Sequence, residues 1–242
     1  TGSGKSVVLA ALCRDAVQLW QSRVLVLAHV HELLSQNRDT ILKLAPELFG
    51  KVGVYSAGLK SRDSKQPVIV AGVQSVYRRA CDLERFDVVI VDEAHRIPEI
   101  GDGQYRTLLA DLRMINPAIR IVGLTATPYR MTTGPICTPE GILNHICFDA
   151  GIRELIHEGY LCPLVSKAAI TKADLSGVHV RGGEFIPGEL EAAMNHDGLV
   201  EAACSEILTC TADRKACLVF ASGVEHGRHI ASVLESKGAS VR

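Results

Sequence analysis

Two short segments carry residues whose types and spacing suit phosphate chemistry. The first is TGSGKS at the start of the chain, which matches the second half of the phosphate-binding pattern GxxxxGK[ST]. Gly2, Ser3 and Gly4 would turn backbone N–H groups toward phosphate oxygens. Lys5 would reach the β- and γ-phosphates of a nucleotide, and Ser6 would ligate Mg²⁺. The alternative is a glycine-rich turn that only caps a helix.

The second segment is VVIVDEAH, in which two carboxylates follow four consecutive apolar β-formers. Asp92 would hold Mg²⁺, directly or through water, and Glu93 would orient and deprotonate the water that attacks the γ-phosphate. An acidic pair at a strand end is often only solvated surface. Ligands of parallel sheets bind at the carboxyl ends of strands, however, and a phosphate loop lies upstream. The two segments together predict nucleotide hydrolysis.

The elements that must position these residues alternate between strand and helix. Short runs rich in Val, Ile and Leu predict buried strands at 23–29, 51–58, 66–73, 86–95 and 118–128. Apolar residues at helical spacing predict helices at 31–45 and 103–115. This alternation predicts an α/β fold, with a parallel sheet covered by helices on both faces.

The pattern weakens after residue 129, where Thr, Gly and Pro become frequent. Further along, the spacing predicts a short helix in 151–164 with a Gly-Tyr break, helices at 197–212 and 223–238, and strands at 215–222 and 239–242. Gly238 would close the last helix. We therefore expect a nucleotide-binding domain at 1–150, a connector at 151–195 and the start of a second α/β domain at 196–242.

Composition limits which partners and which cellular location are expected for the protein. The 242 residues are 47% apolar with a formal net charge of −1, so the chain can bury a core and any contact with nucleic acid must be local. No apolar run approaches the length of a membrane span. The eight cysteines form no CxxC pair, which favours buried reduced thiols in a cytoplasmic protein.

Several other side chains have both a functional and a structural interpretation. Cys137, His145, Cys147 and Cys162 could hold zinc, but their spacing matches no common zinc pattern, and packing thiols with a surface His are favoured. We expect His226 and His229 to be solvated. We expect Trp20 to lie in the core or at its rim rather than to stack on a nucleic-acid base. Arg130 would form a surface ion pair or contact nucleotide or nucleic acid.

The order GSGKS, DEAH, LTATP resembles the first three motifs of the superfamily 2 helicases and translocases. The resemblance implies a RecA-like P-loop NTPase that binds ATP and Mg²⁺, with Lys5, Ser6, Asp92 and Glu93 at the nucleotide and metal. It assigns three residues to the coupling between the nucleotide state and nucleic-acid binding: His95, Thr125 and Thr127. The segments LAHVHELLSQN and VIVAGVQSVYRR resemble the intervening motifs, whose matching residues would contact nucleic-acid phosphates: His29, Gln36, Gln74 and Ser75.

A narrower resemblance is to the RadD group of bacterial DNA-repair helicases, carried by LAHVHELLSQN together with GYLCPL and FASGVEH. It implies a bacterial or phage-like protein acting on single-stranded or duplex DNA, although RNA stays open. The motor subunits of type I and type III restriction systems share many of these motifs and are one alternative. A nucleotide-dependent nucleic-acid clamp without unwinding activity is another. The family's Q-x-x-G-R-x-x-R string is absent, so we expect a section of a longer motor that hydrolyses ATP slowly by itself.

Overall fold

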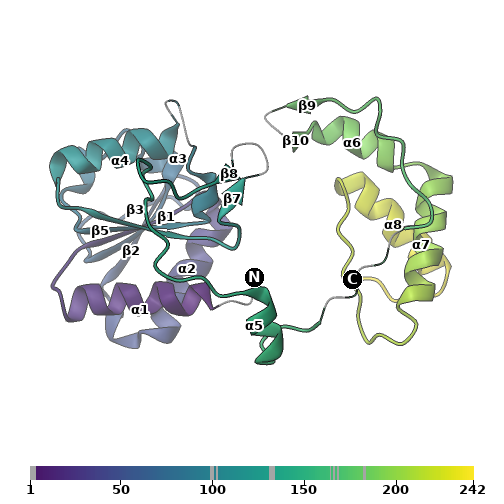
Figure 1. The fold of residues 1–242 in the computed structure, drawn as a ribbon, viewed down its shortest axis with the longest axis horizontal. Helices are drawn as coiled ribbons and strands as arrows, with labels where there is room; N and C mark the ends of the chain where they lie inside the picture. Colours follow the sequence, from purple (N-terminus) through teal and green to yellow (C-terminus); the bar gives the residue numbers. More distant parts are fainter. Residues whose placement is uncertain are drawn as a thin grey trace. The chain divides into compact units, whose positions relative to one another are not determined.

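The computed structural model describes residues 4–98, 101, 103–130, 134–163, 165, 167, 169–181 and 184–242. The chain divides into two compact units, Thr1–Pro163 and Leu164–Arg242 (Figure 1). The segment expected as a connector is shared between them: residues 151–163, which include α5 (Ile152–His157), belong to the first unit and residues 164–195 to the second. The functions assigned to residues 1–150 and 196–242 stay predictions.

The first unit is built on one sheet. Among its described residues the sheet has six strands in the order β3-β2-β4-β1-β5-β6. The strands are β1 (Val24–Ala28), β2 (Val52–Ser56), β3 (Ser61–Arg62), β4 (Val68–Gly72), β5 (Val88–Asp92) and β6 (Arg120–Leu124). Every pairing is parallel except that of β2 with the short β3. The predicted α/β parallel sheet is thus confirmed, and all five predicted strands form.

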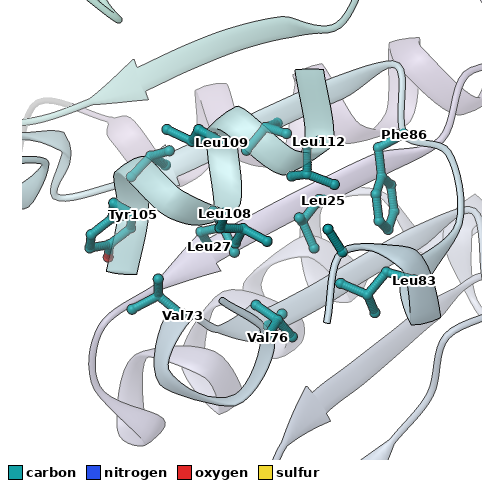
Figure 2. Close-up of a cluster of buried hydrophobic side chains, with 14 of the residues drawn as sticks. Leu25, Leu27, Val73, Val76, Leu83, Phe86, Tyr105, Leu108, Leu109 and Leu112 are labelled. Carbon is teal, nitrogen blue, oxygen red and sulfur yellow. The ribbon is translucent and has the colours of Figure 1, made fainter. Parts of the chain in front are cut away.

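Helices cover the two faces of this sheet (Figure 1). The helices are α1 (Lys5–Gln18), α2 (His31–Leu44), α3 (Val73–Val76) and α4 (Gln104–Ile115). Successive strand residues point to opposite faces, so Val24 and Val26 pack toward α1 and α2, while Leu25 and Leu27 pack toward α3 and α4 (Figure 2). Strands β1 and β4 are buried along their whole length because both faces are covered.

Short elements complete the first unit. They are the 3₁₀ turns η1 (Pro46–Leu48), η2 (Cys81–Leu83) and η3 (Ala94–Arg96), and the antiparallel pair β7 (Tyr129–Arg130) and β8 (Gly134–Pro135). The expected break after α5 is confirmed at Gly159, whose φ of 80° is costly for any residue with a side chain.

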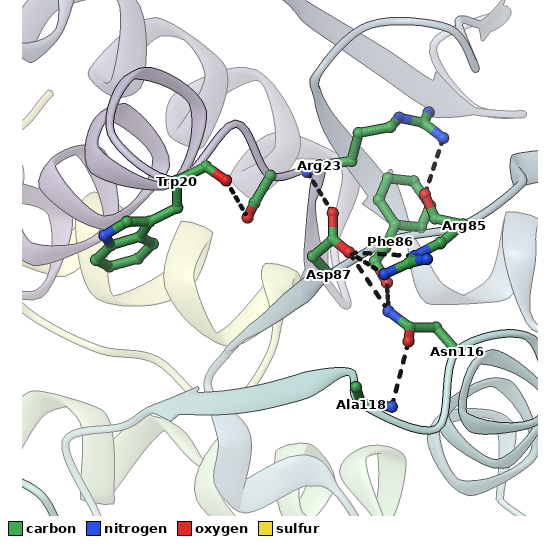
Figure 3. Close-up of polar contacts among 8 residues, drawn as sticks. Trp20, Arg23, Arg85, Phe86, Asp87, Asn116 and Ala118 are labelled. Atoms are coloured by element: carbon green, nitrogen blue, oxygen red, sulfur yellow. Dashed lines mark hydrogen bonds and ion pairs between the residues drawn. The ribbon is translucent and has the colours of Figure 1, made fainter.

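A polar network joins the amino ends of four strands, at the edge opposite the candidate site, and Figure 3 shows its contacts around Arg23, Asp87 and Asn116. The guanidinium of Arg23, just before β1, donates to four carbonyls on the loops leading to β4 and β5: Ser64, Gln66, Leu83 and Arg85, at 2.8 to 3.4 Å. Its backbone N–H donates to Asp87 Oδ2 at 3.0 Å. Asn116, between α4 and β6, donates from Nδ2 to the carbonyl of Phe86 at 2.7 Å and accepts from the N–H of Ala118 at 3.2 Å.

Replacing Asn116 by Ala should lower the free energy of unfolding by about 1–3 kcal/mol, because it leaves a buried carbonyl without its donor. Urea unfolding followed by circular dichroism measures the change. Asn144→Ala, at an exposed position, is the matched control. Equal midpoints for the two variants would contradict the structural role given to Asn116.

The second unit is mostly helical. It contains the hairpin β9 (Val180–Arg181) and β10 (Glu184–Phe185), followed by α6 (Pro187–Met194), α7 (Asp197–Cys210) and α8 (Val224–Ser236). A small core around Val200, Cys204 and Leu234 joins α7 to α8. Gly238 ends α8 with a φ of 89°, as predicted.

Two predicted strands of this unit are wrong. The described residues 215–222 and 239–242 belong to no ladder, and Phe220 is 88% exposed. A run of Val, Leu and Phe becomes a strand only when a neighbour accepts and donates its backbone hydrogen bonds. The described part of this unit offers these residues no parallel partner.

Two side-chain predictions also need correction, and a third is narrowed. Of the eight cysteines only Cys13 and Cys204 are buried, and burial raises the pKa of the Cys13 thiol to about 12. His226 is not solvated: it is 6% exposed, faces Ser222 Oγ across 2.7 Å, and burial lowers its pKa. Trp20, just after α1, is 57% exposed, which excludes the core alternative and leaves the rim alternative.

Candidate active site

The candidate site lies at the carboxyl edge of the sheet, where the loops after β1, β4, β5 and β6 carry the predicted functional residues. The start of α1 lies at the same place. Gly4 precedes this helix with a φ of 77°, a left-handed conformation that suits glycine. Gly2 and Ser3, which were predicted to bind phosphate, lie outside the described residues.

The first contact of the site joins residues far apart in the chain. Lys5 Nζ lies 2.8 Å from Glu93 Oε1, and both side chains are only partly exposed. A parallel sheet explains this proximity, because it brings the start of α1 and the end of β5 to one edge. Ser6 is exposed on the first turn of α1. The lysine of the predicted phosphate loop and the predicted water-activating carboxylate are therefore in direct contact.

Asp92 is held by two hydrogen bonds. Its Oδ1 accepts from the N–H of Glu93 at 3.0 Å, and its Oδ2 accepts from Asn37 Nδ2 at 3.0 Å. Asn37 lies on α2 and is only 5% exposed. Both donors are neutral N–H groups, and the carboxylate oxygens have further lone pairs for a cation.

The backbone bends sharply after Asp92. Glu93 has φ 52° and ψ 53°, the left-handed conformation that non-glycine residues rarely adopt and that costs on the order of 1–3 kcal/mol. This bend turns the Glu93 carboxylate toward Lys5 on one side and leads into η3 on the other. Strain of this kind, held by surrounding contacts, is common at functional positions.

The three predicted coupling residues are brought together beside Glu93. His95 Nδ1 lies 3.3 Å from Glu93 Oε2 and 2.9 Å from Thr125 Oγ1. The Thr125 hydroxyl donates to the carbonyl of Thr127 at 3.1 Å and accepts from the Thr127 N–H. The Thr125 hydroxyl thus links the His95 ring to the backbone of Thr127.

The four predicted nucleic-acid residues are only partly brought together. Gln74 Nε2 donates to the carbonyl of His29 at 2.8 Å, joining the loops after β1 and β4. Burial, and next the charge of Arg96, lowers the pKa of His29. Ser75 Oγ accepts from a backbone N–H after β2, at Ala57. Gln36 is exposed on α2 and makes no such contact among the described residues.

Arg130 does not form the expected surface ion pair with any described carboxylate. Its Nε donates to the carbonyl of His95 at 2.9 Å, and its Nη2 donates to the carbonyl of Ile97. The guanidinium therefore binds the backbone of the turn that follows the two carboxylates.

No cluster of three or more potential metal ligands occurs among the described residues, which include Cys137, His145, Cys147 and Cys162. Asp92 and Glu93 thus form a pair of carboxylates and not a complete protein cage. No helix in the described ranges has the length and apolarity of a membrane span.

Residues 1–130 match the family model described as "Type III restriction enzyme, res subunit", or ResIII. That range is more than half of the chain. The chain belongs to the ResIII family. Its match ends at Arg130 and so includes the phosphate loop, both carboxylates and the LTATP segment.

The ResIII chain is also similar to individual proteins. It is 26% identical to the "Putative ATP-dependent helicase IRC3" of Saccharomyces cerevisiae over 252 aligned residues, which is 98% of this chain and 35% of IRC3. It thus spans about a third of the relative's length. A crystal structure of the UvsW helicase of bacteriophage T4 is 17% identical, with a TM-score of 0.44 over 54% of this chain and 45% of UvsW. A second T4 UvsW structure is 17% identical, with a TM-score of 0.42 over 51% of this chain and 25% of that one.

The sequence interpretation of this ResIII chain missed Asn37. A signal was present, because Asn37 lies three residues after Leu34 and four before Ile41, on the buried face of an amphipathic helix. A polar side chain on such a face needs a partner. Which partner could not be predicted, because it depends on how α2 lies across the sheet.

If Asp92 holds Mg²⁺ as the sequence predicts, replacing Asn37 by Ala should raise the Mg²⁺ concentration needed for half-maximal ATP hydrolysis by about 10- to 100-fold, the usual effect of removing a side chain that orients a metal ligand. Titration of Mg²⁺ at saturating ATP measures the shift. Asn144→Ala serves as the exposed control. An unchanged Mg²⁺ requirement would show that Asp92 does not depend on Asn37 for its orientation.

Proposed function

We propose that this chain is the nucleotide-hydrolysing part of an ATP-dependent helicase or translocase that acts on DNA. The observation that carries this proposal is the 2.8 Å contact between Lys5 and Glu93. It joins the GSGKS segment to the carboxylates after β5, as hydrolysis of a nucleoside triphosphate requires. The ResIII family and the printed name of the yeast relative agree with it.

Each residue of the site has a defined task in this proposal. Lys5 and the N–H groups at the start of α1 bind the β- and γ-phosphates. The phosphates then replace Glu93 as the partner of Lys5. Glu93, released from the lysine, orients the attacking water and accepts its proton.

The oxygen ligands of the site suit Mg²⁺. The Ser6 hydroxyl and the Asp92 carboxylate would hold it, because Mg²⁺ prefers one or two protein oxygens with phosphates and water completing its coordination. When bound, Mg²⁺ neutralises charge on the phosphates. Asn37 would keep the Asp92 carboxylate directed toward it.

The coupling to nucleic acid would pass through His95. Its ring lies between Glu93 and Thr125, and Thr125 is joined to Thr127. His29 and Gln74, joined across two strand ends, would contact the sugar-phosphate backbone together with Ser75 and Gln36.

The finer assignment follows the sequence resemblance. We propose a member of the RadD group that works in DNA repair in the cytoplasm of a bacterium or a phage-infected cell, with single-stranded or duplex DNA as its partner. A net charge of −1 fits a local grip on the phosphates rather than a broad basic surface.

The rate of ATP hydrolysis by the complete gene product, with and without single-stranded DNA, duplex DNA and RNA, tests this function. Stimulation by DNA and not by RNA supports it, and a preference for single strands or duplex separates unwinding from duplex translocation. Stimulation by RNA alone would contradict the DNA assignment. If neither DNA nor RNA stimulated hydrolysis, only the assignment of the nucleotide site would stand, and the action on DNA would be contradicted.

A second candidate is the motor subunit of a restriction system, favoured by the description of the matching family. The same nucleotide site would then drive translocation along duplex DNA toward cleavage. ATP-dependent cutting of a long duplex by the complete gene product, alone or with its neighbouring gene products, distinguishes this candidate from the repair helicase.

A further inference from the structure

Arg130 lies at the end of β7, just beyond the LTATP segment, and is half-buried. It donates two hydrogen bonds to neighbouring parts of the same turn: from Nε to the carbonyl of His95 at 2.9 Å, and from Nη2 to the carbonyl of Ile97. The turn is η3, which follows Asp92 and Glu93 directly. A side chain from the β6–β7 segment thus holds the backbone after β5.

The shape of the guanidinium matters for this contact. Its planar fork presents donors at fixed angles and can bridge two carbonyls at once, whereas a lysine ammonium is a single point charge. The turn itself has little internal support, because η3 is closed by short-range bonds from Arg96 N–H to the Glu93 carbonyl and from Ile97 N–H to the Ala94 carbonyl. Arg130 is therefore an external brace for the turn.

A second link joins the same two segments through side chains. His95 contacts Thr125 Oγ1 at 2.9 Å and Glu93 Oε2 at 3.3 Å. The segment 125–130 therefore holds η3 at two points of His95, by a threonine on its ring and by an arginine on its backbone carbonyl. Displacement of the segment must move the turn.

We infer that Arg130 is a positioning residue, which braces η3 so that His95 stays between Glu93 and Thr125. Through this brace, movement of segment 125–130 changes the placement of the water-activating carboxylate. The inference rests on the proposed function, in which Glu93 activates water. It assigns Arg130 no contact with nucleotide or nucleic acid.

Hydrogen exchange and steady-state kinetics of the complete gene product test this role together. In Arg130→Ala, the amides of Ala94–Ile97 should exchange faster while those of β1 stay unchanged. The kcat for ATP hydrolysis should fall about tenfold or more, with the nucleotide Kd within about twofold, since misplacement of a catalytic group costs rate rather than binding. Arg79→Ala, which breaks an exposed ion pair, is the matched control and should change neither.

Two further variants separate positioning from simple loss of charge. Arg130→Lys keeps the charge but cannot bridge both carbonyls, so its kcat should stay within about threefold of the alanine variant. If Arg130 acts through His95, Arg130→Ala in a His95→Ala background should cause less than about a twofold further loss, because the two residues belong to one unit.

Three results would overturn the inference. If neither the hydrogen exchange of the amides at 94–97 nor kcat changed, Arg130 would not brace the turn. A raised Kd for nucleotide or DNA with normal kcat at saturation would make Arg130 a ligand contact. Faster exchange throughout β1 in both Arg130 variants would make it a general stabiliser. A wild-type protein without ATP hydrolysis would instead contradict the proposed function, and the exchange measurement would still decide whether Arg130 braces the turn.

Discussion

Replacing Glu93 by Gln should leave nucleotide binding intact and lower the rate of ATP hydrolysis by about 10²- to 10⁴-fold, the usual contribution of a general base. The amide keeps the size of the carboxylate and its ability to accept a hydrogen bond, but it cannot take a proton from water at neutral pH. Lys5 would lose a charged partner and keep a neutral one, so the phosphate loop should bind ATP at least as well as before.

Single-turnover hydrolysis at saturating ATP, together with the Kd of a fluorescent ATP analogue, separates the two effects. Glu140→Gln removes a carboxylate from an exposed position of the same unit and should match the wild type. Hydrolysis in the Glu93 variant within tenfold of the wild type would show that another group activates the water.

Replacing Lys5 by Ala should weaken ATP binding by at least about tenfold and abolish measurable hydrolysis, because the lysine supplies the charge that meets the β- and γ-phosphates. The structure adds a second effect. Lys5 is the cation that accompanies Glu93 before nucleotide binds, and without it the strained Glu93 backbone loses one of its restraints.

Equilibrium titration with the same ATP analogue, with and without Mg²⁺, measures the loss. Lys172→Ala, at an exposed position of the second unit, is the control for a general change of charge. Unaltered affinity in the Lys5 variant would mean that the loop before α1 binds no triphosphate, and the nucleotide-site assignment would then be wrong.

The parts of the site that could be predicted from sequence depend on backbone alternation. The run VVIVDEAH places Asp92 and Glu93 at a strand end, and the parallel order of the strands brings that end to the start of α1. That Lys5 and Glu93 lie at the same edge of the sheet follows from this rule.

The remaining features depend on how distant elements pack, which a single sequence does not specify. Asn37 and Arg130 each contact a residue at least 30 positions away, through the register of a helix or a short strand over the sheet. The failed strand at 215–222 has the right composition, but pairing depends on a neighbour and not on propensity. The expectation that His226 is solvated follows from its helical spacing to His229 and the lack of an acidic partner pattern, whereas its burial depends on how α8 packs.

The Arg23 network has a consequence for how such a domain can diverge. It ties the amino ends of β1, β4, β5 and β6 together at the edge away from the site. The groups that stabilise the sheet are thus separated from the loops that carry chemistry. Loops at the carboxyl edge can therefore change in sequence, in length or in their preference for a nucleic acid while the sheet keeps its fold. An engineer seeking altered specificity should randomise that edge and leave Arg23, Asp87 and Asn116 untouched.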